Sequence, residues 1–434
     1  MTLKKNNYFI GGIIFIYCLI GIIPNYGAVD RVAPQWLVLS IANSIGLIYL
    51  YLNYDYYKLT IKKTFQFKPF IFLLLFVVWG LFSYIYAINQ IEVIVKFFTW
   101  INIVLGVLIF CNLIFNVEKG FLVVSYVFTL ILLIELYFSY DPYFQLVSLA
   151  KFNFDYSSVL KGAAANKNIT AASILLKIPF LFYLISNNKN LLIKIFFSVL
   201  VAFSTFMIFL LSARASIIGL FSVTLCFIIV KLFQFTKTKN FYLLKDSFIY
   251  FILPILLSTV MFQAKYGSTN DSVSINKRIT SINTQDESTK QRIRFYEHSF
   301  RQILNNPIVG VGLGNWKISS IDYDKNNIVG YTVPYHVHND FLEIGAELGI
   351  IGLIFYLAVF IYMFYYTIKI IANESSENKE LASKGSILLF GGIIFFIDSN
   401  INFPHARVLI QIPIIIYTAT FFQLYFTKYK NEKL

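Results

Sequence analysis

Long apolar runs separated by short polar segments extend along almost the whole chain. A membrane-spanning helix needs roughly 17 to 25 mostly apolar residues, and by that criterion we expect about twelve spans. The pattern predicts an all-α polytopic membrane protein. The expected spans cover residues 8–23, 36–52, 70–87, 97–115, 121–138, 170–185, 195–211, 217–232, 247–262, 349–370, 386–396 with its continuation, and 409–426.

One polar segment, residues 263–338, is too long to be an ordinary connection between spans. We therefore divide the chain into three parts: nine spans in residues 1–262, one large outer loop with an amphipathic helix in residues 263–340, and three spans with a short tail in residues 341–434. The loop is where we expect chemistry outside the membrane core.

Composition supports the membrane assignment. Of 434 residues, 58% are hydrophobic and only 13% are charged, whereas soluble domains have roughly 25% charged residues. The formal charge of +14 could suggest nucleic-acid binding, but the lysines lie in short loops between apolar runs. Cys18, Cys111 and Cys226 lie in apolar runs without a CxxC motif, which predicts neither disulfides nor a zinc site.

Lysine placement predicts the orientation. If both termini are cytoplasmic, every clear lysine cluster in a short loop falls on the cytoplasmic side. The long polar segment, Arg214 and all four histidines then fall on the opposite side. The run after Lys4 and Lys5 has no small-residue cleavage signature, so we interpret it as an uncleaved first helix. The predicted reaction compartment is extracytoplasmic.

Lys177 is an exception, because it lies inside an expected span. A lysine at that depth costs about 2.5–3.5 kcal/mol on insertion scales unless it snorkels, pairs or faces a polar cavity. Snorkelling or pairing is the simpler interpretation, and a role in a substrate cavity stays open.

His338 and Asn339 begin the helix that continues into the tenth span, in the pattern H-N-x9-G-x-x-G with Gly349 and Gly352. On a helix, these glycines would lie about three turns beyond the histidine and allow neighbouring helices to approach closely. An imidazole with a pKa near 6.5 can accept a proton from a sugar hydroxyl. A capping histidine explains the same spacing. His336 lies outside the pattern.

Three arginines are candidates for anion binding. Arg214 lies in a short polar stretch between two long apolar helices, where it can clamp substrate phosphates or anchor to lipid phosphate. Arg292 and Arg294 begin the expected amphipathic helix 289–305. Its predicted apolar face contains Ile293, Tyr296, Phe300 and Ile303.

The three arginines could neutralise a pyrophosphate leaving group without a metal ion. The outer loops contain no obvious paired-carboxylate cluster that requires one. We interpret Asp322 and Asp324 as solvated, because their loop is rich in lysine and asparagine.

Two further segments are candidates for substrate contact. The glycine-rich stretch around Gly312 is neither a Walker A motif nor a dinucleotide fingerprint, and it predicts a tight turn that brings backbone close to the site. Asn166 and Asn168 precede the sixth span and offer amides for hydrogen bonds. A plain helix N-terminus explains them almost equally well.

Taken together, these motifs resemble the bacterial O-antigen ligase and O-antigen polymerase superfamily. The H-N-x9-G-x-x-G stretch at His338 is similar to its histidine signature, and Ser212-Ala213-Arg214 is similar to its serine-arginine motif, with Ala215 where glycine is usual. Arg292-x-x-x-Tyr296 and the glycine-rich run resemble its large periplasmic loop. The resemblance covers about residues 162–357.

The resemblance implies metal-independent, inverting glycosyl transfer at the periplasmic face of the bacterial inner membrane, without a cofactor. The donor would be a glycan on undecaprenyl pyrophosphate, and the acceptor a sugar hydroxyl, on lipid A-core for a ligase. In this chain His338 would activate the acceptor, and Arg214 and Arg292 would hold the pyrophosphate. Arg294, Asn339, Asn166, Asn168 and Gly312 would contact substrate.

The sequence leaves three alternatives open. A polymerase of lipid-linked glycan and a protein O-oligosaccharyltransferase share these motifs. A flippase or exporter of lipid-linked sugar also needs about twelve spans, although such transporters carry midplane sites and related halves, and no internal repeat is visible. The third kind of alternative, after other glycan transferases and transporters, is a non-catalytic assembly scaffold.

Overall fold

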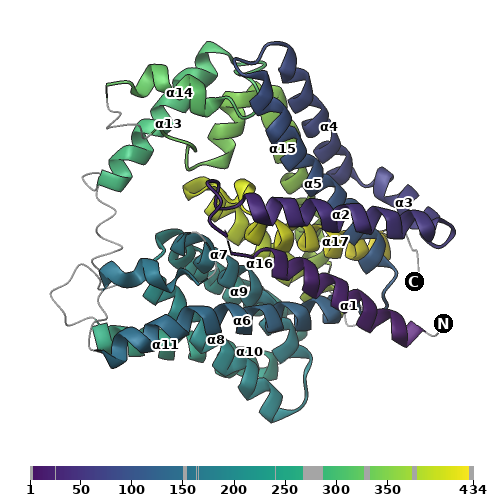
Figure 1. Cartoon of the computed structure of the whole chain (residues 1–434). Helices are drawn as coiled ribbons and strands as arrows, with labels where there is room; N and C mark the ends of the chain where they lie inside the picture. The colour runs from purple at the N-terminus through teal and green to yellow at the C-terminus, as the bar shows by residue number, and fades with distance from the viewer. Residues whose placement is uncertain are drawn as a thin grey trace.

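The computed structural model describes residues 3–24, 26–149, 154–162, 164, 166–239, 241–266, 287–326, 333–373 and 379–429, and within these ranges it contains helices and no strands. Figure 1 shows a helical bundle with a cap at one end. The helices are α1 Leu3–Ile20, α2 Ala33–Leu52, α3 Tyr54–Gln66, α4 Lys68–Phe82, α5 Gln90–Phe115, α6 Gly120–Ser148, α7 Lys167–Asn187, α8 Leu191–Leu211, α9 Arg214–Thr238, α10 Phe241–Ser247, α11 Leu253–Tyr266, α13 Glu287–Asn305, α14 Trp316–Asp324, α15 Asp340–Ala372, α16 Lys379–Ile401 and α17 Val408–Tyr429. Short turns of tighter or wider helix are η1 Ser83–Ile85, η2 Phe154–Lys161, η3 Phe248–Ile252 and η5 Pro404–Ala406.

Among the described residues, 11 helices are long and apolar enough to cross a membrane by length and composition. The apolar part of α1, Asn7–Ile20, is a shorter candidate. The prediction of an all-α polytopic membrane protein is confirmed. Two segments that we expected to be polar loops are partly helical. The basic stretch after α2 forms α3. The helix α6 continues through Asp141 and Pro142, where Tyr140 and Tyr143 are buried.

The centre of the bundle is formed by α7 and α17. In their most apolar stretches, 94% and 89% of the residues are buried. Lys177 lies on α7, and its Nζ is 3.0 Å from Glu135 Oε2 on α6. The ammonium also donates to the Ser173 hydroxyl at 2.6 Å. Pairing, the simpler interpretation of Lys177, is therefore confirmed.

The cap consists of α13 and α14 over the first turns of α15 (Figure 1). The buried side of α13 contains Phe295 and Ser299, and Phe295 packs on Trp316 and Ala346. The predicted apolar face is thus only partly correct, because Ile293 and Phe300 are exposed. Those two side chains, one helical repeat of seven residues apart, suit a helix that meets the membrane interface on its outer side.

The helix α15 is interrupted at Gly349, which has φ 64° and ψ −166°. This interruption frees backbone carbonyls that the glycine-rich turn satisfies: the amides of Val311 and Gly312 donate to Ala346 O and Glu347 O at 3.1 and 2.8 Å. In return, the Ile350 amide donates to Pro307 O at 2.8 Å. The expected close approach at the glycines is therefore made by a turn rather than by a neighbouring helix.

Candidate active site

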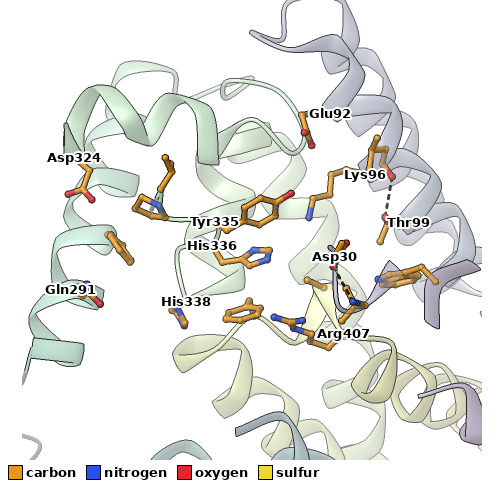
Figure 2. A pocket seen from close by; sticks show the side chains of 18 of the residues that line it. Asp30, Glu92, Lys96, Thr99, Gln291, Asp324, Tyr335, His336, His338 and Arg407 are labelled. Carbon is orange, nitrogen blue, oxygen red and sulfur yellow. Dashed lines mark hydrogen bonds between the residues drawn. The ribbon is translucent and has the colours of Figure 1, made fainter. Parts of the chain in front are cut away.

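A cavity of about 750 Å³ lies between the cap and the bundle. Its walls come from the start of α2, the first turns of α5, the inner side of α13, the segment before α15 and the loop before α17. Figure 2 shows His336, His338 and Tyr335 at its centre, with Gln291 and Asp324 on one wall. Lys96 and Arg407 lie on the opposite wall.

His338 lines this cavity in a backbone conformation that is rare outside glycine, with φ 64°. Its carbonyl accepts a hydrogen bond from the Tyr296 hydroxyl at 3.0 Å, and its ring lies edge-on to Phe403. Nδ1 is buried and has no hydrogen-bond partner among the described residues. The next residue, Asn339, is the N-cap of α15. The imidazole is therefore fixed by its neighbours at the mouth of that helix.

The His338 imidazole is neutral at physiological pH. Burial lowers its pKa to about 4, and the positive charges of Arg292 and Arg407 act in the same direction against an opposing effect of Glu343. A neutral imidazole has a free lone pair and can accept a proton. The ring is therefore available in its unprotonated form, although its lowered pKa makes it a weaker base than an ordinary imidazole.

Arg294 lines the cavity, but its side chain is already paired. Its Nε lies 2.7 Å from Asp324 Oδ1, and the Asp324 carboxylate is 2% exposed. The interpretation of Asp324 as solvated is therefore wrong, because α14 folds back over α13 and buries the carboxylate against the arginine. Arg292 lies two residues before Arg294 on α13, close enough to His338 to shift its pKa.

Arg214 begins α9, and its Nη1 donates to Thr289 Oγ1 at 3.3 Å, in the first turn of α13. Ser212, before it, adopts a left-handed conformation with φ 57° that closes α8 and turns the chain sharply. Arg214 does not line the cavity described above. It nevertheless reaches the same helix that carries Arg292.

The remaining candidates have local structural contacts. The Asn339 side chain caps α15 by accepting from the Phe341 and Leu342 amides, both at 3.0 Å. Asn166 caps α7 by accepting from the Asn168 amide at 2.8 Å, and the Gly312 amide donates to Glu347 O. None of Asn339, Asn166, Asn168 and Gly312 is among the residues that line this cavity. The simple interpretation as helix caps and a tight turn is enough to explain them.

Behind the cavity wall lies a buried group of ionisable side chains, which we call the α15 network: His336, Asp340, Glu343 and His405. His405 Nδ1 lies 2.6 Å from Asp340 Oδ1 and its Nε2 lies 3.4 Å from Glu343 Oε1. His336 Nδ1 donates to Glu343 Oε1 at 2.9 Å, and the Val337 amide donates to Oε2 at 2.9 Å. The network joins the segment before α15 to the loop before α17.

The two histidines of the network carry different charges. Burial lowers the pKa of His336 to about 4 despite its bond to Glu343. Burial acts in the same direction on His405, but the carboxylates of Asp340 and Glu343 outweigh it and raise its pKa to about 10. At neutral pH His405 is therefore a cation between two carboxylates, whereas His336 is a neutral donor.

Ligand atoms of His336, Glu343 and His405 all lie within 4.8 Å of one another, a spacing that a metal ion could bridge. Each of the three side chains already has a hydrogen-bonding or ionic partner within the network. The His405 cation lies between the two carboxylates and offsets one of their two negative charges. The group is complete as a set of ionic hydrogen bonds.

Part of the chain is similar to a known protein family. Residues 174–357 match the model of the O-antigen ligase family. The resemblance to the O-antigen ligase superfamily is confirmed. The matched range includes Arg214, Arg292, Arg294 and His338. It supports glycan transfer in polysaccharide biosynthesis by a multi-pass membrane protein.

Curated relatives agree with this family. A Rickettsia typhi protein named as a polysaccharide ligase is 25% identical over 341 residues, which cover 76% of this chain and 75% of that protein. The Bacillus subtilis teichuronic acid biosynthesis protein TuaE is 25% identical over 233 residues, 52% of this chain and 44% of TuaE. A Rickettsia conorii polysaccharide ligase homologue is 32% identical over 118 residues, 26% of this chain and 28% of that protein.

The sequence did not predict most of the α15 network. It also did not predict the two cations on the cavity wall opposite α13, Lys96 and Arg407. One signal was present: Asp340, Glu343 and Glu347 follow one another at helical spacing where an apolar span begins. Carboxylates at such positions need partners. The partner His405 is 65 residues further along the chain, so no local pattern points to it.

Proposed function

We propose that this protein transfers a glycan from undecaprenyl pyrophosphate to a sugar hydroxyl at the periplasmic face of the bacterial inner membrane, with both termini in the cytoplasm. The reaction is inverting and metal-independent, and the primary candidate is an O-antigen ligase with a lipid A-core acceptor. The observation that carries this proposal is the neutral His338 imidazole, fixed in a cavity within electrostatic reach of Arg292.

In the proposed reaction, His338 accepts the proton of the acceptor hydroxyl as its oxygen attacks the anomeric carbon of the donor. The new C–O bond forms on one face of that carbon while the bond to the phosphate oxygen breaks on the other, so the configuration inverts. The electron pair leaves with undecaprenyl pyrophosphate. Arg292, with Arg214 joined to the same helix through Thr289, stabilises the charge that develops there.

A polysaccharide polymerase is the second candidate, because one relative is named for teichuronic acid biosynthesis. In that case the acceptor hydroxyl belongs to a growing lipid-linked glycan, and the roles of His338 and Arg292 are the same. Mass spectrometry of the glycosylated product identifies the acceptor and separates the two candidates.

The decisive test uses the purified full chain in lipid nanodiscs with a lipid-linked glycan and measures release of undecaprenyl pyrophosphate. We expect His338→Ala to lower the rate by on the order of 10²–10⁴-fold. The matched control is His298→Gln, a histidine on α13 that is not among the cavity-lining residues. Undiminished transfer by a folded His338→Ala protein would refute the proposal, and movement of the lipid-linked glycan without release of pyrophosphate would identify a flippase.

A further inference from the structure

The wall of the cavity opposite α13 carries two cations that the proposed transfer does not use. Lys96 lies in the second turn of α5, and Arg407 lies directly before α17. Figure 2 shows their charged ends at the cavity on either side of His336. Lys96 acts electrostatically on His336, and Arg407 acts on His338. Arg407 is therefore near the proposed catalytic base His338, and Lys96 is near His336, two residues before it.

The carboxylates of the cavity lining do not neutralise these two cations. Asp324 is paired with Arg294, and Glu92 is paired with Lys317 at 2.7 Å. The third carboxylate, Asp30, accepts from the Val32 amide at 3.0 Å and acts electrostatically on Arg407, but it forms no ion pair with Arg407 within 4.0 Å in the described part of the chain. Two positive charges thus face a cavity of about 750 Å³.

Arg407 is held rigidly toward the cavity although its own bonding is incomplete. Its guanidinium carbon lies 4.7 Å from the centre of the Phe403 ring, which also stacks on His336 with ring centres 4.4 Å apart. Its Nε is buried and has no hydrogen-bond partner among the described residues. Lys96 likewise has no ion pair within the described ranges, and Glu347, which is near it, is turned to the Trp316 amide. Arg407 is partly buried with an unbonded Nε, and an anionic ligand would offset the cost of that burial.

The position of these cations identifies the substrate to which the anion belongs. In an inverting displacement the acceptor oxygen and the leaving group lie on opposite faces of the anomeric carbon. The proposed pyrophosphate site is on α13 and α9, whereas Lys96 and Arg407 line the opposite wall of the cavity, near His336 and His338 respectively (Figure 2). We infer that Lys96 and Arg407 bind an acidic group, a carboxylate or a phosphate monoester, on the acceptor glycan. This inference rests on the proposed function.

Binding to the full chain in phosphatidylcholine nanodiscs, which supply no anionic lipid, tests the inference. One probe pair is a glucuronate-containing hexasaccharide and its methyl ester. The other pair is maltotriose with and without a terminal 6-phosphate. We expect the wild type to bind at least one acidic probe roughly 10- to 100-fold more tightly than its neutral partner, as charge-assisted hydrogen bonds imply. The probe pair that shows the preference identifies the acidic group as a carboxylate or a phosphate.

The double variant Lys96→Gln/Arg407→Gln should lose the preference while it binds the neutral probes as the wild type does, which also shows that it is folded. Arg407→Lys should keep most of the preference. Lys384→Gln is the matched control, because that lysine is paired with Glu380 on α16, away from the cavity lining.

Three results would overturn the inference: no preference in the wild type, an unchanged preference in the double variant, or a double variant that loses binding of geranyl pyrophosphate instead of the acidic glycan. The last result would assign the pair to the donor. The proposed function fails through a different result. That result is undiminished glycan transfer by His338→Ala, and it does not depend on how the acidic probes bind.

Discussion

His405 Nδ1 lies 2.6 Å from Asp340 Oδ1, although the two residues are 65 positions apart in the chain. The His405 amide donates to the second oxygen of the same carboxylate at 3.3 Å. Asp340 is the first residue of α15 and follows directly after Asn339, so the loop before α17 is tied to the helix start that positions His338. The ring of Trp100 lies parallel to the His405 ring and covers it.

This contact predicts a pH-dependent stability. Because the pKa of His405 is raised from 6.5 to about 10, its protonation stabilises the fold fully below pH 6.5, less as the pH rises, and not at all above about 10. We expect the melting temperature of the wild type to fall between pH 6.5 and 9 by on the order of 5 °C more than that of His405→Gln. Thermal unfolding in nanodiscs at several pH values measures this difference, and parallel curves would contradict the prediction.

Gly349→Ala should disrupt the joint between α15 and the glycine-rich turn. A Cβ at this position would lie 2.2 Å from Ile308 O, and the backbone has φ 64°, so the added methyl group has neither space nor a relaxed conformation. We expect a loss of about 1–3 kcal/mol of stability and a large loss of transfer, because the first turns of α15 must shift. Gly12→Ala is the matched control, since a Cβ added there would meet no neighbouring side chain or helix within 4 Å. Equal thermal stability of both variants would argue against the prediction.

Removing one partner of the Lys177–Glu135 pair should lower the free energy of unfolding far more than removing both partners. Lys177→Met leaves the Glu135 carboxylate buried without its cation, which typically costs about 3–5 kcal/mol. Adding Glu135→Gln should restore most of this loss, because the amide can still bond to Ser173. Unfolding in mixed micelles measures the three proteins, and a double variant as unstable as the single one would show that the pair is not the cause.

Chelation should leave transfer unchanged. The α15 network is bonded internally, and the leaving group is proposed to be neutralised by arginines, so we expect EDTA to alter the rate by less than about two-fold. Loss of activity in EDTA that added divalent metal reverses would contradict this. It would make His336, Glu343 and His405 the first candidates for the metal site.

Hydropathy alone predicts the helical spans, because each span depends on a local apolar window of about twenty residues. The helix around Arg292 also depends on a local pattern and was predictable. Its buried side, however, contains Phe295 and Ser299 rather than the expected apolar face that includes Ile293 and Phe300. The Arg294–Asp324 pair was not predictable, because the residues around Asp324 are polar and the arginine that buries it is 30 positions away. The interruption at Gly349 depends equally on a distant turn, whose amides replace the lost helical bonds.

The burial of α7 limits how this protein can be inserted into a membrane. A helix that is covered on nearly every side by protein and carries a lysine costs about 2.5–3.5 kcal/mol more to place in lipid by itself than the same helix without the charge. Its counter-charge, Glu135, is on α6, which precedes it in the chain and packs against it. The pair therefore lets the two helices enter the membrane together as a hairpin in which the buried charges of Lys177 and Glu135 offset each other.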